Sequence, residues 1–309
     1  MRIVFMGTPA AAVPSLQRCL ADGHEVVAVW TQPDRPSGRG HKVTPSPVKV
    51  FALEHQLPIY QPNKIKTDEA KTLFAAHEAD VAVVVAYGRI LPAEFLSAPR
   101  LGCINVHFSL LPLYRGAAPV NWAIVNGETN TGVTTMFIAP ELDSGPILLQ
   151  ERTEIGSAET APELMARLAP MGANLLGETL SRLNEISPIP QDDALATFAP
   201  ILKKEDGQID WSRDAAEIER AVRGFQPWPN AYTHQESHRL IIWNAEVANS
   251  DVDVFYPGDV VAAHGDELII QCGGVSQLLL TEVQPEGKRR MSARDYLNGG
   301  HLDLGDKLH

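Results

Sequence analysis

An amide, an imidazole and a carboxylate stand out in the sequence as a set that could do chemistry. Asn105 and His107 are separated by one residue, and Asp143 follows in the segment Leu-Asp-Ser-Gly. Asn105 and a protonated His107 could both donate hydrogen bonds to the oxyanion of a tetrahedral intermediate. Asp143 could carry a proton between an attacking and a leaving nitrogen. The three groups are therefore suited to moving an acyl unit onto an amine without a covalent enzyme intermediate.

A buried strand is predicted over residues 102–107, because this run is apolar and β-prone. Alternation along a strand places Asn105 and His107 on the same face, about 7 Å apart. Leu110-Leu111-Pro112 ends the strand, so both side chains lie near its carboxyl end, where open parallel sheets bind ligands. A plainer interpretation is also open: these are satisfied polar groups at a strand end, and Asp143 caps a turn.

The three cysteines are far apart in the sequence and form no Cys-x-x-Cys motif. Cys19, Cys103 and Cys272 are therefore predicted to be buried thiols of a protein that works in a reducing cytoplasm. Cys103 shares the strand face of Asn105 and is a possible nucleophile. Its greater distance from the strand end disfavours that role.

Length and charge limit the other possibilities. A chain of 309 residues is typical of two domains, and its net charge of −12 argues against a general nucleic-acid binder. Any contact with RNA must use local basic patches. No apolar run approaches the ~20 residues of a membrane span, and the N-terminus does not resemble a signal peptide.

The first part of the chain alternates between apolar strands and helices, which predicts an α/β, Rossmann-like domain with a parallel sheet covered on both faces. The segment Gly-Thr-Pro-Ala-Ala-Ala at 7–12 lacks the glycine spacing of a dinucleotide site. Strands are predicted at 2–6, 25–31, 81–86, 102–107, 131–138 and 146–154, and helices at 11–21, 46–56, 67–77, 119–126 and 160–185.

The pattern changes after residue 188. Prolines and polar residues predict a linker over 189–207, which leaves a first domain at 1–188 and a second at 208–309. The second domain begins with a helix at 214–224. Short β-rich runs then predict a small OB-like β-barrel. These runs are at 239–247, 258–264, 267–272 and 277–283.

Three motifs carry a resemblance to the folate-dependent formyltransferases: Asn-Val-His-Phe-Ser-Leu-Leu-Pro at 105–112, Leu-Tyr-Arg-Gly-Ala-Ala-Pro at 113–119, and Leu-Asp-Ser-Gly at 142–145. The resemblance implies 10-formyltetrahydrofolate as formyl donor and Asn105, His107 and Asp143 as catalytic residues. It also implies a folate-contacting loop, joined by the backbone of the neighbouring strand end. The implied folate residues are Ser109, Leu110, Leu111, Pro112, Tyr87 and Gly88.

A second resemblance lies in the loop at 32–47, where Gln-Pro-Asp-Arg-Pro-Ser-Gly-Arg-Gly is similar to the RNA-contacting loop of formyltransferases that act on methionyl-tRNA. Arg39 stands between two glycines, so it can project into a groove at little steric cost. The linker, the barrel and a terminal segment around 287–300 extend the resemblance over nearly the whole chain. The implied partner is initiator methionyl-tRNA, with the product used to initiate translation. The implied tRNA-contacting residues are Arg35, Arg39, Lys42, Lys288, Arg289 and Arg290, with Lys49 as a further phosphate contact.

The chain departs from the family pattern in three places. Phe108 is bulky where relatives often have a small residue, and alternation predicts that it packs away from the site. Leu113 stands at an often basic position. The region 208–309 has nine Lys and Arg against sixteen Asp and Glu, so its share of tRNA binding is in doubt.

Two alternatives to this function stay open. One is a formyltransferase with another acceptor, a purine-pathway ribonucleotide or an amino sugar, against which the basic loop and the barrel argue. The other is a non-catalytic RNA- or folate-binding module, against which the intact Asn105, His107 and Asp143 argue. No metal is expected, although His234 and His238 have a ligand-like spacing. A monomer is expected.

Overall fold

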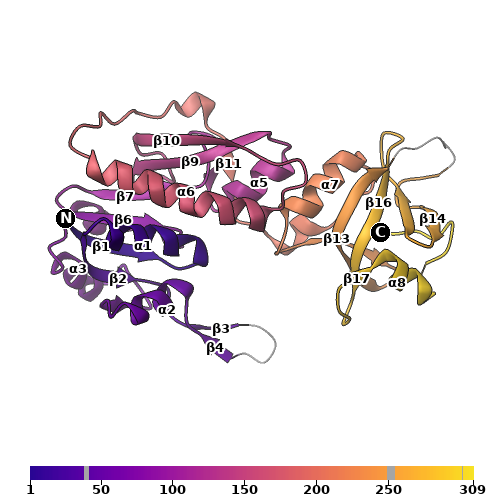
Figure 1. Cartoon of the computed structure of the whole chain (residues 1–309), viewed down its shortest axis with the longest axis horizontal. Coiled ribbons are helices and arrows are strands. Elements are labelled where there is room, and N and C mark those ends of the chain that lie inside the picture. The colour runs from indigo at the N-terminus through magenta and orange to yellow at the C-terminus, as the bar shows by residue number, and fades with distance from the viewer. Residues whose placement is uncertain (38–41, 249–254, 301) are drawn as a thin grey trace. The chain divides into compact units, whose positions relative to one another are not determined.

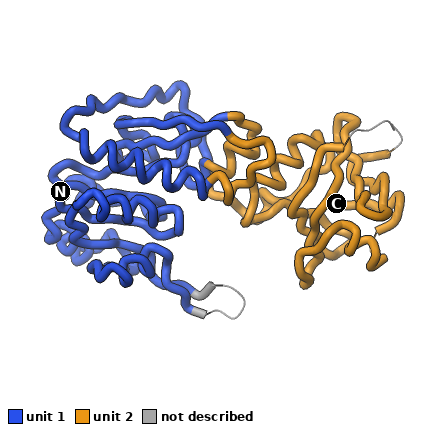
Figure 2. Tube along the Cα trace, viewed as in Figure 1, with its two compact units in different colours: residues 1–119, 130–154, 165–199 blue, residues 120–129, 155–164, 200–309 orange. Residues whose placement is uncertain are grey.

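The computed structural model describes residues 1–37, 42–248, 255–300 and 302–309. Two compact units make up the chain, and Figure 2 colours them separately. The N-terminal unit comprises 1–119, 130–154 and 165–199, and the C-terminal unit comprises 120–129, 155–164 and 200–309. The predicted boundaries at 188 and 207 stay a prediction. No helix among the described residues is long and apolar enough to cross a membrane.

A seven-stranded sheet forms the centre of the N-terminal unit, in the order β10-β9-β7-β6-β1-β2-β5. Neighbouring strands from β5 to β7 are parallel, as the sequence predicts. By contrast, β9 is antiparallel to both β7 and β10. The connection from β9 to β10 is too short for a parallel crossover, which accounts for the second of these pairings. The strands are β1 Arg2–Gly7, β2 Glu25–Trp30, β5 Ile59–Tyr60, β6 Val81–Val85, β7 Cys103–His107, β9 Asn130–Phe137 and β10 Ile147–Glu154.

Two helices of this unit begin at residues whose side chains cap them. Ser46 accepts a hydrogen bond from the Lys49 amide at the start of one helix, and Thr67 accepts from the Ala70 amide at the start of the next. In Figure 1 the long helix α6 runs along the sheet beside β9. The helices are α1 Val13–Ala21, α2 Pro47–Glu54, α3 Asp68–Ala75, α4 Ala93–Ser97, α5 Pro119–Val125 and α6 Ala161–Ser181. Both α5 and α6 also have residues in the C-terminal unit.

Helix α6 covers the sheet face opposite Asn105 and His107. Thr179 of this helix is 2.8 Å from Thr135 of β9, hydroxyl to hydroxyl. A Cβ placed on Gly172 would lie 2.8 Å from a methyl of Val106 and 3.4 Å from the Phe108 ring. Phe108 is therefore buried under α6, away from the site face, which confirms its predicted packing role.

The C-terminal unit is built on an antiparallel sheet in the order β12-β13-β16-β15-β14, with β17 paired to β16. Its last residues bridge the two edges: Leu308 pairs with Gln235 of β12, and Lys307 pairs with Asp259 beside β14. Asp214 caps α7 by accepting from the Ala216 amide. The elements are α7 Ala215–Gly224, β12 Ala231–Gln235, β13 His238–Ala248, β14 Val260–His264, β15 Glu267–Gln271, β16 Gln277–Pro285, β17 Met291–Ser292 and α8 Ala293–Asn298.

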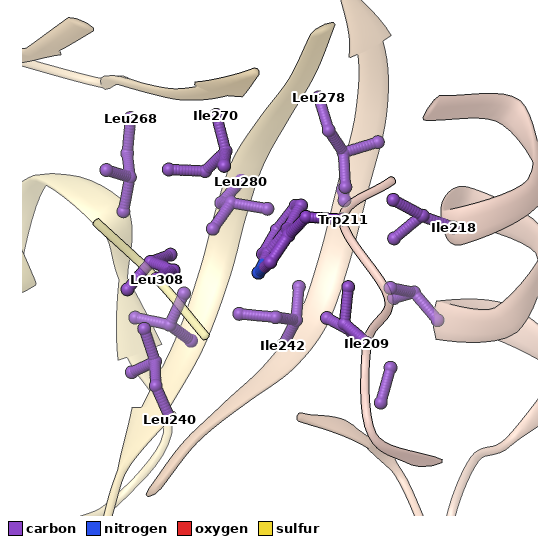
Figure 3. Packing of buried hydrophobic residues seen from close by; sticks show 14 of the residues in the cluster. Ile209, Trp211, Ile218, Leu240, Ile242, Leu268, Ile270, Leu278, Leu280 and Leu308 are labelled. Atoms are coloured by element: carbon purple, nitrogen blue, oxygen red, sulfur yellow. The ribbon is translucent and has the colours of Figure 1, made fainter. Parts of the chain in front are cut away.

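Figure 3 shows the apolar core of this unit, in which Trp211 lies among aliphatic side chains from the strands and from α7. The indole nitrogen of Trp211 donates to the Thr233 hydroxyl at 3.0 Å, so its one polar atom is satisfied inside the core. Each fully buried leucine or isoleucine of such a core contributes about 1.5–3 kcal/mol to folding. The fold class predicted from the sequence, an α/β domain followed by a small β domain, is confirmed.

Two segments predicted to be irregular contain short paired strands. In the loop at 32–47, β3 (Arg35–Ser37) pairs antiparallel with β4 (Lys42–Thr44). Within the predicted linker, β11 (Phe198–Ala199) pairs parallel with β8 (Arg115–Gly116). The second pairing fixes part of the 189–199 segment against the N-terminal unit, beside the third residue of the Leu-Tyr-Arg-Gly motif.

Candidate active site

Asn105 and His107 are two positions apart in β7, so their side chains lie on one face of the sheet. Asn105 pairs with Met136 of β9, and His107 pairs with Thr134. His107 is 5% exposed, while Asn105 is only partly buried. In the described part of the chain, the Asn105 side chain has no hydrogen-bond partner. Its amide donors therefore remain available to a ligand at the end of the strand.

The imidazole of His107 is held between a carbonyl and a carboxylate. Its Nε2 lies 2.9 Å from the carbonyl oxygen of Tyr114, and since a carbonyl only accepts, Nε2 carries a proton. Its Nδ1 faces Asp143 Oδ2 at 3.7 Å. That separation exceeds a hydrogen bond, so Asp143 leaves Nδ1 free to donate to another acceptor. The structure thus brings all three predicted catalytic side chains to one edge of the sheet.

Asp143 takes its position from an unusual loop backbone. Its φ is 47°, in the left-handed region that Asp tolerates better than most residues. The backbone N–H of Gly116 donates to Oδ2 of Asp143 at 2.8 Å. Gly145 must be glycine, since a Cβ there would lie 1.8 Å from the Phe137 carbonyl oxygen. The glycine of the Leu-Asp-Ser-Gly segment is therefore required by the geometry of this loop.

Two residues that the sequence did not single out support this loop. The side-chain amide of Gln191 donates to the carbonyls of Asp143 and Gly145, at 2.8 and 2.7 Å. Arg115, buried at 5% exposure, donates through Nε to Gln191 Oε1 at 2.9 Å. Arg115 belongs to a motif that carried the family resemblance. Gln191 stands among linker-like residues, and no local pattern marks it.

The predicted folate loop is rigidly hydrogen-bonded. The buried Ser109 hydroxyl donates to the Leu113 carbonyl at 2.6 Å. The Leu111 amide donates to the Thr134 hydroxyl at 3.1 Å. Leu110 and Pro112 are partly exposed, whereas Ser109 and Leu111 are buried. Contacts from this loop would therefore come mainly from Leu110, Pro112 and backbone groups.

Tyr87 and Gly88 are at the end of the adjacent strand, β6. The Tyr87 ring is 2% exposed in an apolar cluster with Trp30 and Phe95, and burial raises the pKa of its hydroxyl to about 12. Its carbonyl accepts from the Gln32 side chain at 3.1 Å. Gly88 is exposed, with a φ of 79° that glycine adopts freely. Only the backbone at these positions could meet a ligand, as the sequence predicts.

Cys103 is not suited to nucleophilic attack. Its thiol is 3% exposed and donates to the Phe95 carbonyl at 3.3 Å. Burial raises the pKa of this thiol to about 12, so it is protonated at neutral pH. Cys19 and Cys272 are buried as well, and burial raises the pKa of each thiol to about 12.

The predicted RNA loop is only partly described. Arg39 lies outside the described residues, and for Lys42 only the backbone is described. Arg35 is exposed, and its Nη2 lies 3.4 Å from the Gln32 side-chain oxygen. Lys49 instead forms an ion pair with Asp34 at 2.5 Å, so its charge is already balanced within the protein.

The basic cluster of the C-terminal unit separates into paired and unpaired residues. Arg290 pairs with Glu282 and lies over the Trp243 ring at 4.9 Å from its centre, and Arg294 pairs with Asp266. Lys288 and Arg289 are exposed, and neither forms an ion pair within the part of the chain that is described.

Around His234 and His238, as over the rest of the described ranges, no three His, Cys, Asp or Glu side chains gather as metal ligands. His234 lies within β12, where its backbone N–H donates to the His309 carbonyl at 2.8 Å. The carboxyl edge of β7 therefore remains the candidate site, and its groups suit acyl transfer to an amine.

Comparison with known proteins matches both halves of the chain to formyl transferase domains. The family model described as "Formyl transferase" matches residues 1–180, and "Formyl transferase, C-terminal domain" matches 201–301. "Methionyl-tRNA formyltransferase" of Geobacter metallireducens is 47% identical over 310 residues, covering 100% of this chain and 98% of the relative. "Methionyl-tRNA formyltransferase" of Methylococcus capsulatus is also 47% identical and covers 100% and 99%.

Solved structures at low identity share the fold. WlaRD, a sugar 3N-formyl transferase solved in the presence of dTDP and 5-N-formyl-THF, gives a TM-score of 0.67 at 19% identity, covering 94% of this chain and 99% of that one. HypX from Aquifex aeolicus, solved in complex with tetrahydrofolic acid, gives 0.63 at 16% identity, covering 99% and 48%. The full-length match to relatives and the two family models establish that the chain belongs to the formyl transferase family.

Proposed function

We propose that this protein transfers a formyl group from 10-formyltetrahydrofolate to the free amino group of methionyl initiator tRNA. The product, formylmethionyl-tRNA, would serve translation initiation. The observation that supports this most strongly is the grouping of Asn105, His107 and Asp143 at the carboxyl edge of β7. The relatives named methionyl-tRNA formyltransferase, which align with the whole chain, support the choice of acceptor.

The proposed reaction begins when the methionyl amine attacks the formyl carbon, which forms a carbon–nitrogen bond and a tetrahedral oxyanion. The free amide of Asn105 and the protonated Nδ1 of His107 donate to that oxyanion, and one such donor is typically worth about 10²–10³ in rate. Asp143 accepts the proton of the attacking amine and returns it to the folate nitrogen, directly or through water. The bond to that nitrogen then breaks, so atoms and charge balance without a covalent enzyme intermediate.

The donor side of the site is proposed to hold the folate through the loop after β7 and the end of β6. Leu110 and Pro112 offer partly exposed apolar surface, and Gly88 allows close approach of a flat ring to the backbone. Ser109, Leu111 and Tyr87 contribute through backbone groups and by shaping the loop, because their side chains are buried. No metal takes part in the proposed chemistry.

The tRNA is proposed to contact basic residues of both units. Arg35 is exposed beside β3, and Lys288 and Arg289 are exposed in the C-terminal unit. Arg39 and Lys42 are proposed from the sequence alone. Arg290 is a weaker candidate, since Glu282 neutralises it.

Further proposals concern the domain boundaries, the oligomeric state, the location in the cell and the absence of a metal. A catalytic domain spans 1–188, a linker 189–207, and a tRNA-binding domain 208–309. The enzyme acts as a monomer in the cytoplasm. Sedimentation of the purified chain tests whether it is a monomer. Activity that survives dialysis against a chelator would support a mechanism without metal.

An acceptor comparison tests the proposed function. Radiolabelled 10-formyltetrahydrofolate would be offered with methionyl initiator tRNA, with an amino-sugar nucleotide, or with an amino-bearing ribonucleotide. Transfer to methionyl-tRNA at a much higher kcat/KM is the expected result. Preferential transfer to either small acceptor would overturn the proposed acceptor while leaving the formyl chemistry intact. No transfer to any acceptor would favour a binding module.

A further inference from the structure

Gln191 lies where it can fix the orientation of the catalytic loop. Its Nε2 donates to the carbonyl oxygens of Asp143 and Gly145, on both sides of Ser144. We infer that Gln191, itself oriented by Arg115, is a positioning residue that keeps the Asp143 carboxylate aligned for proton transfer. This inference rests on the proposed function, in which Asp143 moves the proton.

The orientation of the Gln191 amide is determined by its other neighbour. Arg115 can only donate hydrogen bonds, so the atom it contacts must be the oxygen of the amide. The –NH₂ group must therefore face the loop, where its two hydrogens match the two carbonyl acceptors. In this orientation the amide oxygen accepts from Arg115 and the –NH₂ group donates to both carbonyls. Reversal of the amide would break all three hydrogen bonds.

The loop needs such support because of its own backbone. Asp143 adopts a φ of 47°, which most side chains rarely adopt, so the conformation must be stabilised by its surroundings. Gly116 holds the carboxylate through Oδ2, and Gln191 holds the backbone carbonyl of the same residue. Loss of either contact would let the carboxylate turn away from His107, 3.7 Å distant.

The same chain segment supports His107. The Tyr114 carbonyl that accepts from His107 belongs to a residue whose own N–H donates to the Thr197 hydroxyl at 2.8 Å. The Arg115 N–H donates to the Thr197 carbonyl at 2.9 Å. Residues of the 189–199 segment, predicted only as linker, thus hold the partner of the imidazole as well as the carboxylate loop.

Replacement of Gln191 by Glu separates positioning from folding. Glu keeps the shape and offers Arg115 an opposite charge, but it presents an acceptor to the two carbonyls of the loop. We expect kcat to fall by about 100-fold, the typical cost of a misplacement near 1 Å, with unchanged KM for folate and tRNA. The melting temperature should fall no more than in a control variant that loses two comparable hydrogen bonds. Gln191→Met, which lacks donors altogether, should show the same loss if the Glu variant folds poorly.

A matched control is available in the C-terminal unit. Gln226 also donates to two carbonyls, those of Val222 and Trp243, at 3.2 and 2.8 Å. Gln226→Glu therefore removes the same kind of contact away from the catalytic loop, and we expect it to leave kcat unchanged. An equal loss of kcat in the control variant would overturn the inference.

Double substitution tests whether Gln191 acts through Asp143. If it does, adding Gln191→Glu to Asp143→Asn should cost little more than Asp143→Asn alone, because effects through one group are not additive. A fully multiplicative loss would contradict the positioning role. Active Asp143→Asn would sink the proposed proton transfer itself, whereas inactive Asp143→Asn with a fully active Gln191→Glu would sink the positioning role alone.

Discussion

The catalytic edge of β7 and the basic cluster near 288–294 contain functional candidates of opposite character. At the catalytic edge, His107 is buried and each candidate is fixed by its neighbours or left with free donors at the strand end. In the basic cluster the side chains are exposed, and Arg290 and Arg294 are paired with acidic residues. In the first region, hydrogen bonds fix the positions of the side chains. In the second region, only the positive charge that is not neutralised by acidic side chains can bind a phosphate.

The difference shows what a motif can and cannot reveal. A short motif fixes spacing along one strand, so it determines where the Asn105 amide and the His107 imidazole point. Charge along a sequence does not determine local charge in space, because Glu282 and Asp266 come from other elements. Substitutions at the two regions should therefore change different quantities: rate at the first, and salt-dependent binding at the second.

The largest effect is expected at Asp143. Asp143→Asn keeps the shape and the Gly116 contact but removes the proton acceptor, so kcat should fall by about 10²- to 10⁴-fold. Folate and tRNA affinities should stay unchanged, as measured by equilibrium binding. A variant that loses affinity in proportion to its rate would assign Asp143 to binding.

Asn105→Ala and His107→Ala should each cost about 10²–10³ in kcat, since each removes one donor to the oxyanion. Rapid-quench measurement at saturating substrates would record the chemical step. His107→Ala also removes the bond to the Tyr114 carbonyl, so its melting temperature serves as the control. Turnover close to that of the unmodified enzyme in either variant would exclude its role.

The basic cluster should show a smaller and purely electrostatic effect. Replacing Lys288 and Arg289 by Gln should reduce the slope of log affinity against log salt by up to about 2, because each phosphate contact adds about 0.7 to 0.9. Replacing the ion-paired Arg290 and Arg294 by Gln is the matched control and should change the slope less. Equal changes for both pairs would show that their acidic partners do not neutralise them when tRNA binds.

Cys103→Ala should have the smallest effect of all. Its thiol, with a pKa raised to about 12 by burial, is protonated at neutral pH and takes no part in the proposed reaction. We expect unchanged kcat and a destabilisation of about 1 kcal/mol, a common value for a single substitution. Loss of turnover in a folded Cys103→Ala variant would revive a covalent route.

The sequence predicts most of the fold because the buried strands and capped helices carry strong local patterns. The strand at 102–107, for example, agrees with β7 at Cys103–His107. The antiparallel direction of β9 is not predictable from its own residues, since an apolar strand has the same pattern in either direction. The short connection to β10 predicts only that β9 and β10 are antiparallel, while the longer connection from β7 to β9 permits either direction.

The catalytic side chains of the candidate site are predictable from the sequence, but the contacts that hold them are not. Asn105 and His107 follow from alternation along one strand, and Asp143 from the family resemblance. The contacts of Gln191 join it to residues 46 and 48 positions earlier in the chain, so only the folded structure brings them together. Conversely, the sequence suggests Lys49 as a phosphate contact, but in the structure its ammonium group forms an ion pair with Asp34.

A single-turnover experiment tests the central claim most directly. Enzyme in excess is mixed with radiolabelled 10-formyltetrahydrofolate and methionyl initiator tRNA, quenched at intervals, and separated into folate, protein and tRNA. The account predicts that label passes from folate to methionyl-tRNA in one phase, with none bound covalently to the protein. Label that accumulates on the protein first, or that never reaches the tRNA, would contradict it.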